Sequence, residues 1–434
     1  ITGYSVLYGL ALGMEPICGQ AYGAKQHNLM IKTTRMTMIG LAMASLPIAC
    51  LWLAMGSILV ACGQDPGVTA TASVYLLYSL PDLAAQCVLH PLRIYLRSQN
   101  VTVPLSCCAA LSLPLHLLAN ALAVRVLGLG VRGVALASVS TNLNMLLLLL
   151  AYLKLSKRPI ITMGPISSSS TSSSLGSSSS SSSSSVGSSS SVGSGLGLDG
   201  SNARDWMPLL KLAVPSCVSV CLEWWWYELM IVFSSFLLDE PKAAVAAMGI
   251  LIQTTSLVYI FPSSLSLAVS TRVGNELGAN RPASARLAVM VASCVAIVLG
   301  VLSMGFTTAI RHAWGHVFTD DKTILRLTSL ALPIIGLCEL GNSPQTTGCG
   351  VLRGSARPSV GVKINLAAFY IVGLPVSVAL VFWFHVGFVG LWLGLLAAQA
   401  TCAVSMMLVM MRTNWLLEAD RSRELTKKTS TPMA

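Results

Sequence analysis

The amino-acid sequence predicts an all-α polytopic membrane protein with two six-helix lobes, of which the first lacks its first helix in this chain. Three observations predict this fold: an apolar composition, a series of long apolar segments, and an internal repeat. Hydrophobic residues make up 54% of the 434 residues, and charged residues only 10%. Soluble globular domains carry about 25% charged residues because their surface faces water. We therefore expect most of this protein's surface to face lipid.

Eleven apolar segments follow one another along the chain. Each is close to the roughly 20 residues that a helix needs to cross about 30 Å of hydrocarbon. They lie at residues 2–24, 37–61, 72–92, 103–124, 133–153, 209–236, 245–270, 287–310, 324–350, 361–384 and 388–411. Their number predicts a multi-pass protein.

The charges between these segments predict an orientation. Of the 27 basic residues, 21 fall in one alternating set of loops. The opposite set holds only Arg125, Arg132, Lys242, Arg311, Lys322 and Arg326. Because Lys and Arg concentrate on the cytoplasmic side of membrane proteins, the richer set is expected in the cytoplasm. The expected location is the plasma membrane, the vacuolar membrane or another endomembrane.

A Ser-rich segment divides the chain. Residues 167–195 are nearly all Ser, and such a composition buries too little apolar surface to offset the entropy of ordering. The predicted organisation is an N-lobe with five of six transmembrane helices at 1–153, a disordered cytoplasmic linker at 154–205, a C-lobe with six helices at 206–412, and a cytoplasmic tail at 413–434.

The two sides of this linker resemble each other. Residues 19–24 match 274–279 at an offset of 255, Leu96-Arg97 matches Leu352-Arg353 at 256, and residues 129–134 match 386–391 at 257. Transporters are commonly built from such repeats, with the substrate site between them. The counterpart of the 209–236 segment would precede residue 1, so the repeat predicts twelve spans in the intact protein. Six spans per half predict a pseudo-twofold axis along the membrane normal.

Composition argues against several other classes of function. The net charge of +11 is scattered between the apolar segments and forms no basic patch, so we expect no nucleic-acid partner. The 12 cysteines show no CxxC or Cys/His ligand spacing, and we expect neither a metal nor another cofactor. The expected partners are the lipid bilayer, protons and a small-molecule substrate, and the protein is expected to be a monomer.

Acidic residues inside apolar segments are the strongest functional candidates, because an uncompensated charge at the bilayer centre costs at least about 2.5–3.5 kcal/mol. Glu223 lies near the middle of its segment, where desolvation favours reversible protonation. Trp224 and Tyr227 beside it offer π faces to an organic cation. The alternative is an interfacial aromatic belt, but such belts lie at segment ends. Glu228 lies about 140° further round the helix, towards another face or the outer vestibule.

A second polar face is predicted in the segment 324–350. The spacing of Glu339, Asn342 and Thr346 places them on one side of a helix. Pro344 interrupts the backbone hydrogen bonds there and frees a carbonyl for ions or water. This pattern indicates the lining of a cavity.

Residues of the first segment are candidates for a gate. Glu15 and Gln20 lie towards its cytoplasmic end, and Glu15 is alternatively a helix-end group without a role in transport. The glycine pairs Gly19/Gly23 and Gly274/Gly278 have the GxxxG spacing that allows helices to pack closely.

Three stretches resemble the plant DETOXIFICATION branch of the multidrug and toxic compound extrusion (MATE) exporters. They are residues 13–25, 221–226 and 271–278, and residues 338–342 and 350–354 are similar to one plant subgroup. The resemblance implies twelve helices in two lobes, alternating access, and cation export driven by proton entry. It places the family's proton-linked acid on Glu223. The family's other common acid aligns with Asn342, an amide here, which leaves Glu339 as its substitute.

The sequence therefore predicts a proton-coupled antiporter that exports organic cations, hormones, secondary metabolites or xenobiotics. Proton and substrate compete for one acidic site, and each favours a different access state. A flippase for lipids or lipid-linked oligosaccharides is the alternative within transport, although the interior acids disfavour it. An intramembrane enzyme is the alternative from another class, and the sequence shows no paired catalytic residues for it.

Overall fold

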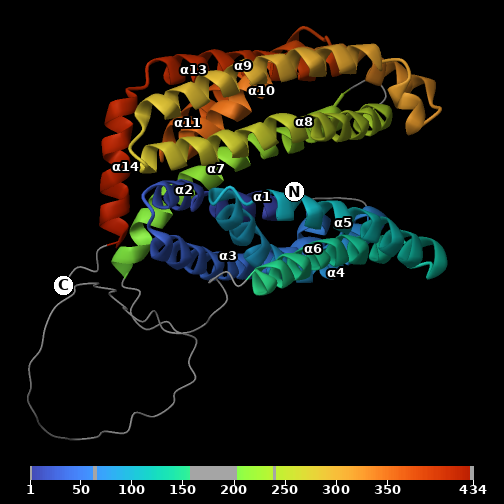
Figure 1. The fold of residues 1–434 in the computed structure, drawn as a ribbon. Coiled ribbons are helices and arrows are strands. Elements are labelled where there is room, and N and C mark those ends of the chain that lie inside the picture. The colour runs from blue at the N-terminus through green and yellow to red at the C-terminus, as the bar shows by residue number, and fades with distance from the viewer. Residues whose placement is uncertain (1, 62–65, 157–202, 238–240, 431–434) are drawn as a thin grey trace, which may run out of the picture.

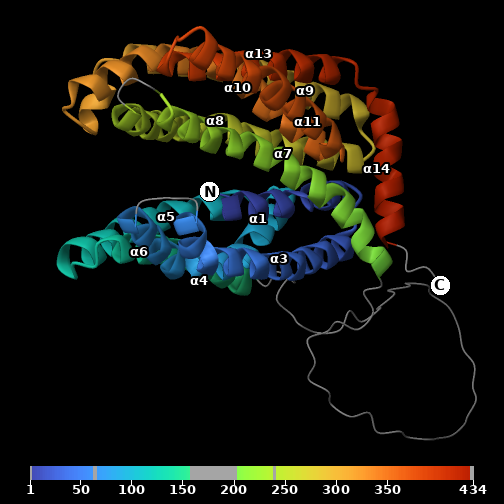
Figure 2. The same cartoon turned by 180° about the vertical axis from the view of Figure 1, so that it is seen from behind.

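The computed structural model describes residues 2–61, 66–156, 203–237 and 241–430, and the regular elements in these ranges are all helices. Figure 1 shows the helices of the two halves of the chain as two groups that lie one above the other, and Figure 2 shows the same division from behind. The predicted Ser-rich linker falls almost entirely outside the described residues. The predicted all-α class is confirmed.

The first group contains seven helical elements. They are α1 (Thr2–Leu12), α2 (Glu15–Gly23), α3 (His27–Ala61), α4 (Pro66–Ser98), α5 (Val103–Asn120), the π-helical turn η1 (Ala121–Val126) and α6 (Val131–Leu155).

The second group completes the fold. It consists of α7 (Ala203–Ser235), α8 (Pro241–Gly278), α9 (Pro282–Ala309), the short η2 (Trp314–Val317), α10 (Lys322–Gly354), α11 (Pro358–Asn365), η3 (Leu366–Gly373), α12 (Leu374–Val378), η4 (Ala379–Trp383), α13 (Phe388–Met411) and α14 (Trp415–Ser430). The run from α11 to η4 is one continuous span with π-helical turns. Pro375 lacks a backbone N–H, which explains a local change of hydrogen-bond pattern there.

Ten helices within the described residues are long and apolar enough to cross a membrane. They correspond to ten of the eleven predicted segments. The prediction of one continuous helix at 2–24 is wrong, because α1 ends at Leu12 and α2 begins at Glu15. Pro16 stands in the first turn of α2, and its missing N–H cannot continue the hydrogen bonds of α1. Gly13 lies at this break against the backbone of Ala213 in α7, where no larger residue fits.

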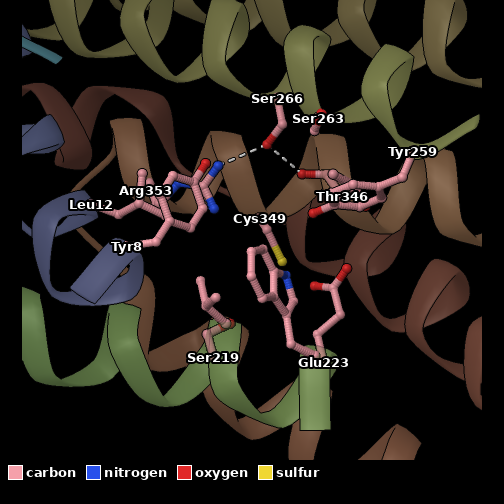
Figure 3. A pocket seen from close by; sticks show the side chains of 12 residues that line it. Tyr8, Leu12, Ser219, Glu223, Tyr259, Ser263, Ser266, Thr346, Cys349 and Arg353 are labelled. Carbon is pink, nitrogen blue, oxygen red and sulfur yellow. Dashed lines mark hydrogen bonds between the residues drawn. The ribbon is translucent and has the colours of Figure 1, made fainter. Parts of the chain in front are cut away.

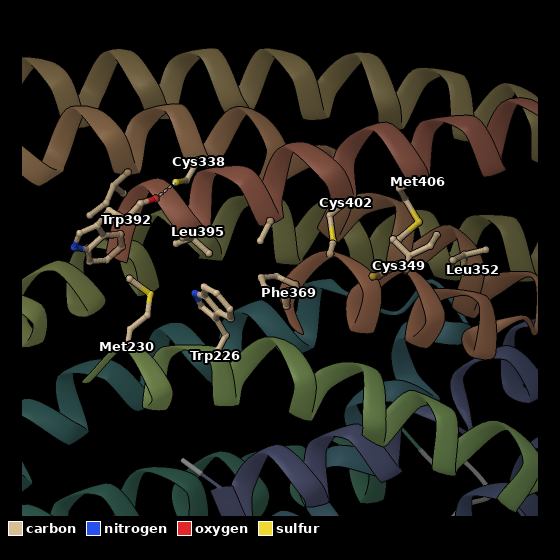
Figure 4. Packing of buried hydrophobic residues seen from close by; sticks show 14 of the residues in the cluster. Trp226, Met230, Cys338, Cys349, Leu352, Phe369, Trp392, Leu395, Cys402 and Met406 are labelled. Carbon is tan, nitrogen blue, oxygen red and sulfur yellow. Dashed lines mark hydrogen bonds between the residues drawn. The ribbon is translucent and has the colours of Figure 1, made fainter. Parts of the chain in front are cut away.

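α7 passes from one hydrophobic core to the other. Leu209 and Leu212, near its beginning, are buried in the first-lobe cluster, whereas Trp226 and Met230 are buried in the second-lobe cluster. In the second cluster Trp226 packs against Phe369, with ring centroids 5.6 Å apart (Figure 4). α7 therefore connects the two lobes along its own length.

The repeat-related glycines meet at the contact between α2 and α8. A Cβ atom on Gly19 would lie 3.4 Å from Cα of Gly274, its counterpart in the repeat. Gly23 packs against Asn275, and its counterpart Gly278 packs against Gln20, the counterpart of Asn275. Reciprocal contacts of this kind are what a twofold axis produces. The predicted GxxxG packing is confirmed, and the pseudo-twofold axis passes between Gly19 and Gly274.

The segment predicted as a tail, 413–434, contains a docked helix. α14 contacts α8 and α9 of the second lobe and α2 of the first. Ala419 is buried in the second-lobe core, and Leu425 packs against the first-lobe core. Glu418 forms an ion pair of 3.4 Å with Arg357. α14 therefore bridges the two lobes at the end of the molecule where α2 meets α8 (Figure 1).

Candidate functional site

A small cavity lies where α1 meets α7, α8 and α10 (Figure 3). Its free volume of about 20 Å³ is room for a single water molecule. The lining consists of Tyr8 and Leu12 from α1; Ser219, Val220, Glu223 and Trp224 from α7; Tyr259, Ser263 and Ser266 from α8; and Thr346, Cys349 and Arg353 from α10. Its charged members are Glu223 and Arg353.

Glu223 has an amide partner but no cationic one. Its carboxylate accepts a hydrogen bond of 3.3 Å from Nε2 of Gln345 on α10. The ion pairs within the described residues do not include Glu223. A half-buried carboxylate that forms no ion pair is costly to keep charged, and this favours its binding of a proton or a cation.

Two rings form an aromatic wall beside this carboxylate. Trp224 of α7 stacks on Tyr8 of α1, with centroids 6.0 Å apart and an angle of 23° between the planes. On its other side Tyr8 contacts the ring of His90 on α4, at 5.4 Å. The wall therefore runs from the second lobe into the first.

The other candidates on α7 do not line this cavity. Tyr227 packs against the second-lobe core, and Glu228 forms no hydrogen bond with the described residues. Trp225 donates a hydrogen bond of 3.3 Å to Oγ of Ser5. Trp224, Trp225 and Tyr227 therefore lie in different surroundings, because successive residues point to different sides of a helix.

The polar face predicted on α10 is present and forms a hydrogen-bonded chain. Asn342 Nδ2 donates to Glu339 at 2.9 Å, and Thr346 Oγ1 donates to Asn342 Oδ1 at 3.2 Å. Thr346 also lies 3.2 Å from Oε1 of Gln345, whose amide group reaches Glu223. Glu339 is buried and does not line the cavity. The chain nevertheless connects the two carboxylates through three polar side chains.

Glu15 joins the two lobes beside the cavity. Its carboxylate forms ion pairs of 3.2 Å with Arg97 of α4 and of 3.2 Å with Arg353 of α10. Gln20 donates a hydrogen bond of 3.0 Å to the carbonyl of Gly354. Both gate candidates therefore hold first-lobe elements to α10, at the end where α2 meets α8.

Several charged residues in the interior were not predicted from the sequence. Arg97 and Arg353 were assigned to loops, but α4 and α10 extend beyond their apolar segments and carry both side chains into the interior. The repeat that matches Leu96-Arg97 with Leu352-Arg353 was the signal available for them. Asp82, buried on α4, accepts a hydrogen bond of 2.9 Å from Asn142. Its position within an apolar segment was the signal for this acid.

Known proteins match the chain over most of its length. The MatE family model matches residues 1–122 and 215–379. Protein DETOXIFICATION 48 of Arabidopsis thaliana is 51% identical over 429 residues, which cover 99% of this chain and 74% of the relative. Protein DETOXIFICATION 49 of the same plant is 49% identical, with coverage of 98% and 78%.

Solved structures have the same fold. The crystal structure of the eukaryotic MATE transporter AtDTX14 aligns with a TM-score of 0.83 and 29% identity, covering 98% of this chain and 88% of that one. A crystal structure of the Vibrio cholerae MATE transporter VcmN aligns with a TM-score of 0.74 and 16% identity, with coverage of 96% and 87%. Members of this family are transporters and not enzymes, which removes the intramembrane enzyme as an alternative. The family match and the nearly full-length identity together show that this chain belongs to the MatE family, as a transporter of its plant DETOXIFICATION branch.

Proposed function

We propose that this transporter exports organic molecules with a cationic group in exchange for protons, and that Glu223 binds both. The observation that carries the proposal is the half-buried carboxylate of Glu223, which lines an inter-lobe cavity, accepts a hydrogen bond from an amide and forms no ion pair among the described residues. The rings of Tyr8 and Trp224 beside it are suited to the flat or cationic part of an organic substrate.

Exchange requires only that proton and substrate exclude each other and favour different arrangements of the lobes. A cation at Glu223 satisfies the same charge that a proton neutralises, so the two compete. Glu339, Asn342 and Thr346 contribute a polar contact that adjusts this competition through their hydrogen-bonded chain. Tyr227 and Glu228 are further candidates for contact with substrate on the same helix.

The ion pairs of Glu15 and the hydrogen bond of Gln20 act in this proposal as a gate that closes one end of the transport path. The gate lies near the loops that carry most of the basic residues, which we assign to the cytoplasm. α14 lies at this end as well. The arrangement described here then corresponds to a transporter closed to the cytoplasm.

Uptake of radiolabelled tetraethylammonium into proteoliposomes with an acidic lumen tests the proposal on the full-length protein. Protons that leave the lumen should drive accumulation of the cation. Glu223→Gln should lower gradient-driven uptake about tenfold or more, since the amide carries neither proton nor charge. It keeps the side-chain shape, so the protein should still fold.

Asp320→Asn provides the matched control, because it removes an exposed acid in a loop far along the chain from the site. It should transport as the wild type does. Wild-type pH dependence in Glu223→Gln would exclude Glu223 as the exchanging acid.

A further inference from the structure

The cavity contains two opposite charges that do not form an ion pair with each other. Figure 3 shows Arg353 and Glu223 on opposite sides of it, with Cys349 between them. The ion pairs of the described residues give Arg353 a partner in Glu15 but none in Glu223. The two charges therefore act on each other across the cavity without forming an ion pair.

The charge at the arginine end is only partly compensated. Glu15 is shared between Arg97 and Arg353, so two guanidinium groups depend on one carboxylate. Nε of Arg97 is buried without a hydrogen-bond partner among the described residues. A buried cation that lacks a full countercharge favours an additional anion.

The repeat explains why a carboxylate is lacking. Arg97 and Arg353 are counterparts at an offset of 256 residues, and Gln20 and Asn275 are counterparts at 255. At the same offset of 255, the counterpart of Glu15 is Ser270. Ser270 is buried, and its Oγ has no partner within the described part of the chain. The pseudo-twofold thus repeats the arginine but not the acid.

A further basic residue lies on α4. Arg93 precedes Arg97 by about one turn, and its hydrogen bond goes to Sδ of Met145 at 2.8 Å. This partner is neutral, and the buried carboxylate of Asp82 on the same helix compensates part of the charge of Arg93.

We propose that the substrate is amphoteric: its cationic group binds Glu223, its anionic group, such as a carboxylate, binds Arg353, and Glu15 competes for the same guanidinium. The proposal rests on the proposed role of Glu223 for the cationic half. When the lobes meet at this end, Glu15 occupies Arg353 and the substrate's anion is displaced. When they separate there, Arg353 loses Glu15 and becomes available. The free volume of about 20 Å³ agrees with displacement in the arrangement described.

The geometry of Arg353 suits this exchange. Its Nε faces Glu15 at 3.2 Å, while Nη2 donates to Oγ of Ser266 at 2.8 Å. Ser266 in turn donates to the carbonyl of Thr346 at 2.6 Å. Contacts at Nε and Nη2 therefore hold the planar guanidinium group of Arg353 in place at the cavity wall. This orientation suits the binding of a carboxylate.

Three probes of one shape test the proposal by binding to the purified full-length protein, measured by calorimetry. They are 4-(aminomethyl)benzoate, which is a zwitterion; its methyl ester, which is a cation; and its N-acetyl derivative, which is an anion. The zwitterion should bind about tenfold more tightly than the ester, the size expected of one charge-assisted hydrogen bond. Equal affinity for the zwitterion and the ester would overturn the proposal.

Substitutions test which residues cause the preference for the zwitterion over the ester. Arg353→Gln should remove the preference for zwitterion over ester. Glu15→Gln should increase affinity for the zwitterion, because it removes the competitor. Ser270→Asp should decrease this affinity, because it supplies the missing acid. If Arg353 had only a structural role, Glu15→Gln and Ser270→Asp would not shift the affinity for the zwitterion in opposite directions. These two variants therefore test the anion site even if Arg353→Gln does not fold.

Binding of the cationic ester distinguishes a failure of this proposal from a failure of the proposed function. If Glu223→Gln leaves binding of the ester unchanged, then Glu223 does not bind the cation and the proposed function fails. A preference for zwitterion over ester that depends on Arg353 would still stand in that case. A preference that persists in Arg353→Gln would overturn the anion site alone.

Discussion

Gln345 follows Pro344 on α10, and its side-chain amide stands between the acid of α7 and the polar groups of α11. Nε2 lies 3.3 Å from Glu223 and 3.4 Å from Oδ1 of Asn365. Asn365 in turn donates to Ser219 of the cavity lining at 3.2 Å. The position of the Glu223 carboxylate thus depends on neutral amides from two other helices. Amides of this kind orient a carboxylate without neutralising it, which is what the proposed proton exchange at Glu223 requires.

Changes to the partners of Glu223 should shift the pH dependence of transport in opposite directions. Glu339→Gln removes a nearby negative charge, which makes ionised Glu223 less costly and should shift the midpoint of transport to lower pH. Gln345→Leu removes a donor to the ionised form and should shift the midpoint to higher pH. We expect each shift to be about 0.5–1 pH unit, as for one screened charge or one hydrogen bond. Tetraethylammonium uptake measured against external pH checks both, and shifts in the same direction would contradict this account of the site.

Among the helices, α2 of the first lobe and α8 of the second make a close contact between the lobes. Their glycines allow backbone to approach backbone, and the hydrogen bonds beside them repeat the symmetry of the packing. Gln20 donates to the carbonyl of Gly354 at 3.0 Å, and its counterpart Asn275 donates to the carbonyl of Ser98 at 3.2 Å. Small residues at such interfaces promote association in a membrane, where no hydrophobic effect drives helices together.

A methyl group in this contact should therefore separate the helices. In Gly278→Ala the added Cβ would overlap the backbone of Gln20. The expected cost is about 1–3 kcal/mol, as for overpacking elsewhere, and thermal unfolding in detergent measures it. Gly305→Ala is the control, because its Cβ would meet nothing within 4 Å. Equal stability of the two variants would show that the α2–α8 contact adds nothing to closure.

The sequence predicted the elements better than their ends. Ten apolar segments were predicted correctly as spans, because about twenty consecutive apolar residues are typical of a transmembrane helix. The break after Leu12 was not predicted, since it depends on the fit of Gly13 against Ala213 in α7, which is distant along the chain. Glu223 could be selected from its own segment. The ion pairs of Glu15 could not, because they join residues 82 and 338 positions apart.

At the scale of the whole molecule, the described residues include two helices, α7 and α14, that contact both lobes. α7 extends from the first-lobe core into the second, while α14 lies across both at the end where Glu15 joins them. The amphipathic character of α14 explains its place: Ala419 is buried in the second-lobe core, Leu425 is partly buried against the first-lobe core, and the side chain of Asp420 between them is 69% exposed. Separation of the lobes at this end must remove α14 from one of its two surfaces.

Removal of residues 415–430 should therefore lower the barrier to separation. If the lost packing amounts to about 1 kcal/mol, the maximal rate of tetraethylammonium uptake should rise about fivefold. The cavity lies outside this helix, so the KM should stay unchanged. Asp420→Asn, which changes only an exposed side chain of α14, should behave as the wild type does. A change of KM without a change of maximal rate would show that α14 acts on the site instead.

The bridge formed by α14 separates two properties that a transporter would otherwise adjust together. In the proposed mechanism, substrate choice depends on side chains of α1, α7, α8 and α10, whereas the frequency of the conformational cycle depends also on how firmly α14 is docked. Mutation or modification of α14 can then alter the capacity of the membrane for export while the range of exported compounds stays the same. In the proposed mechanism, a change confined to α14 therefore alters the flux of the exported compounds without altering which compounds are exported.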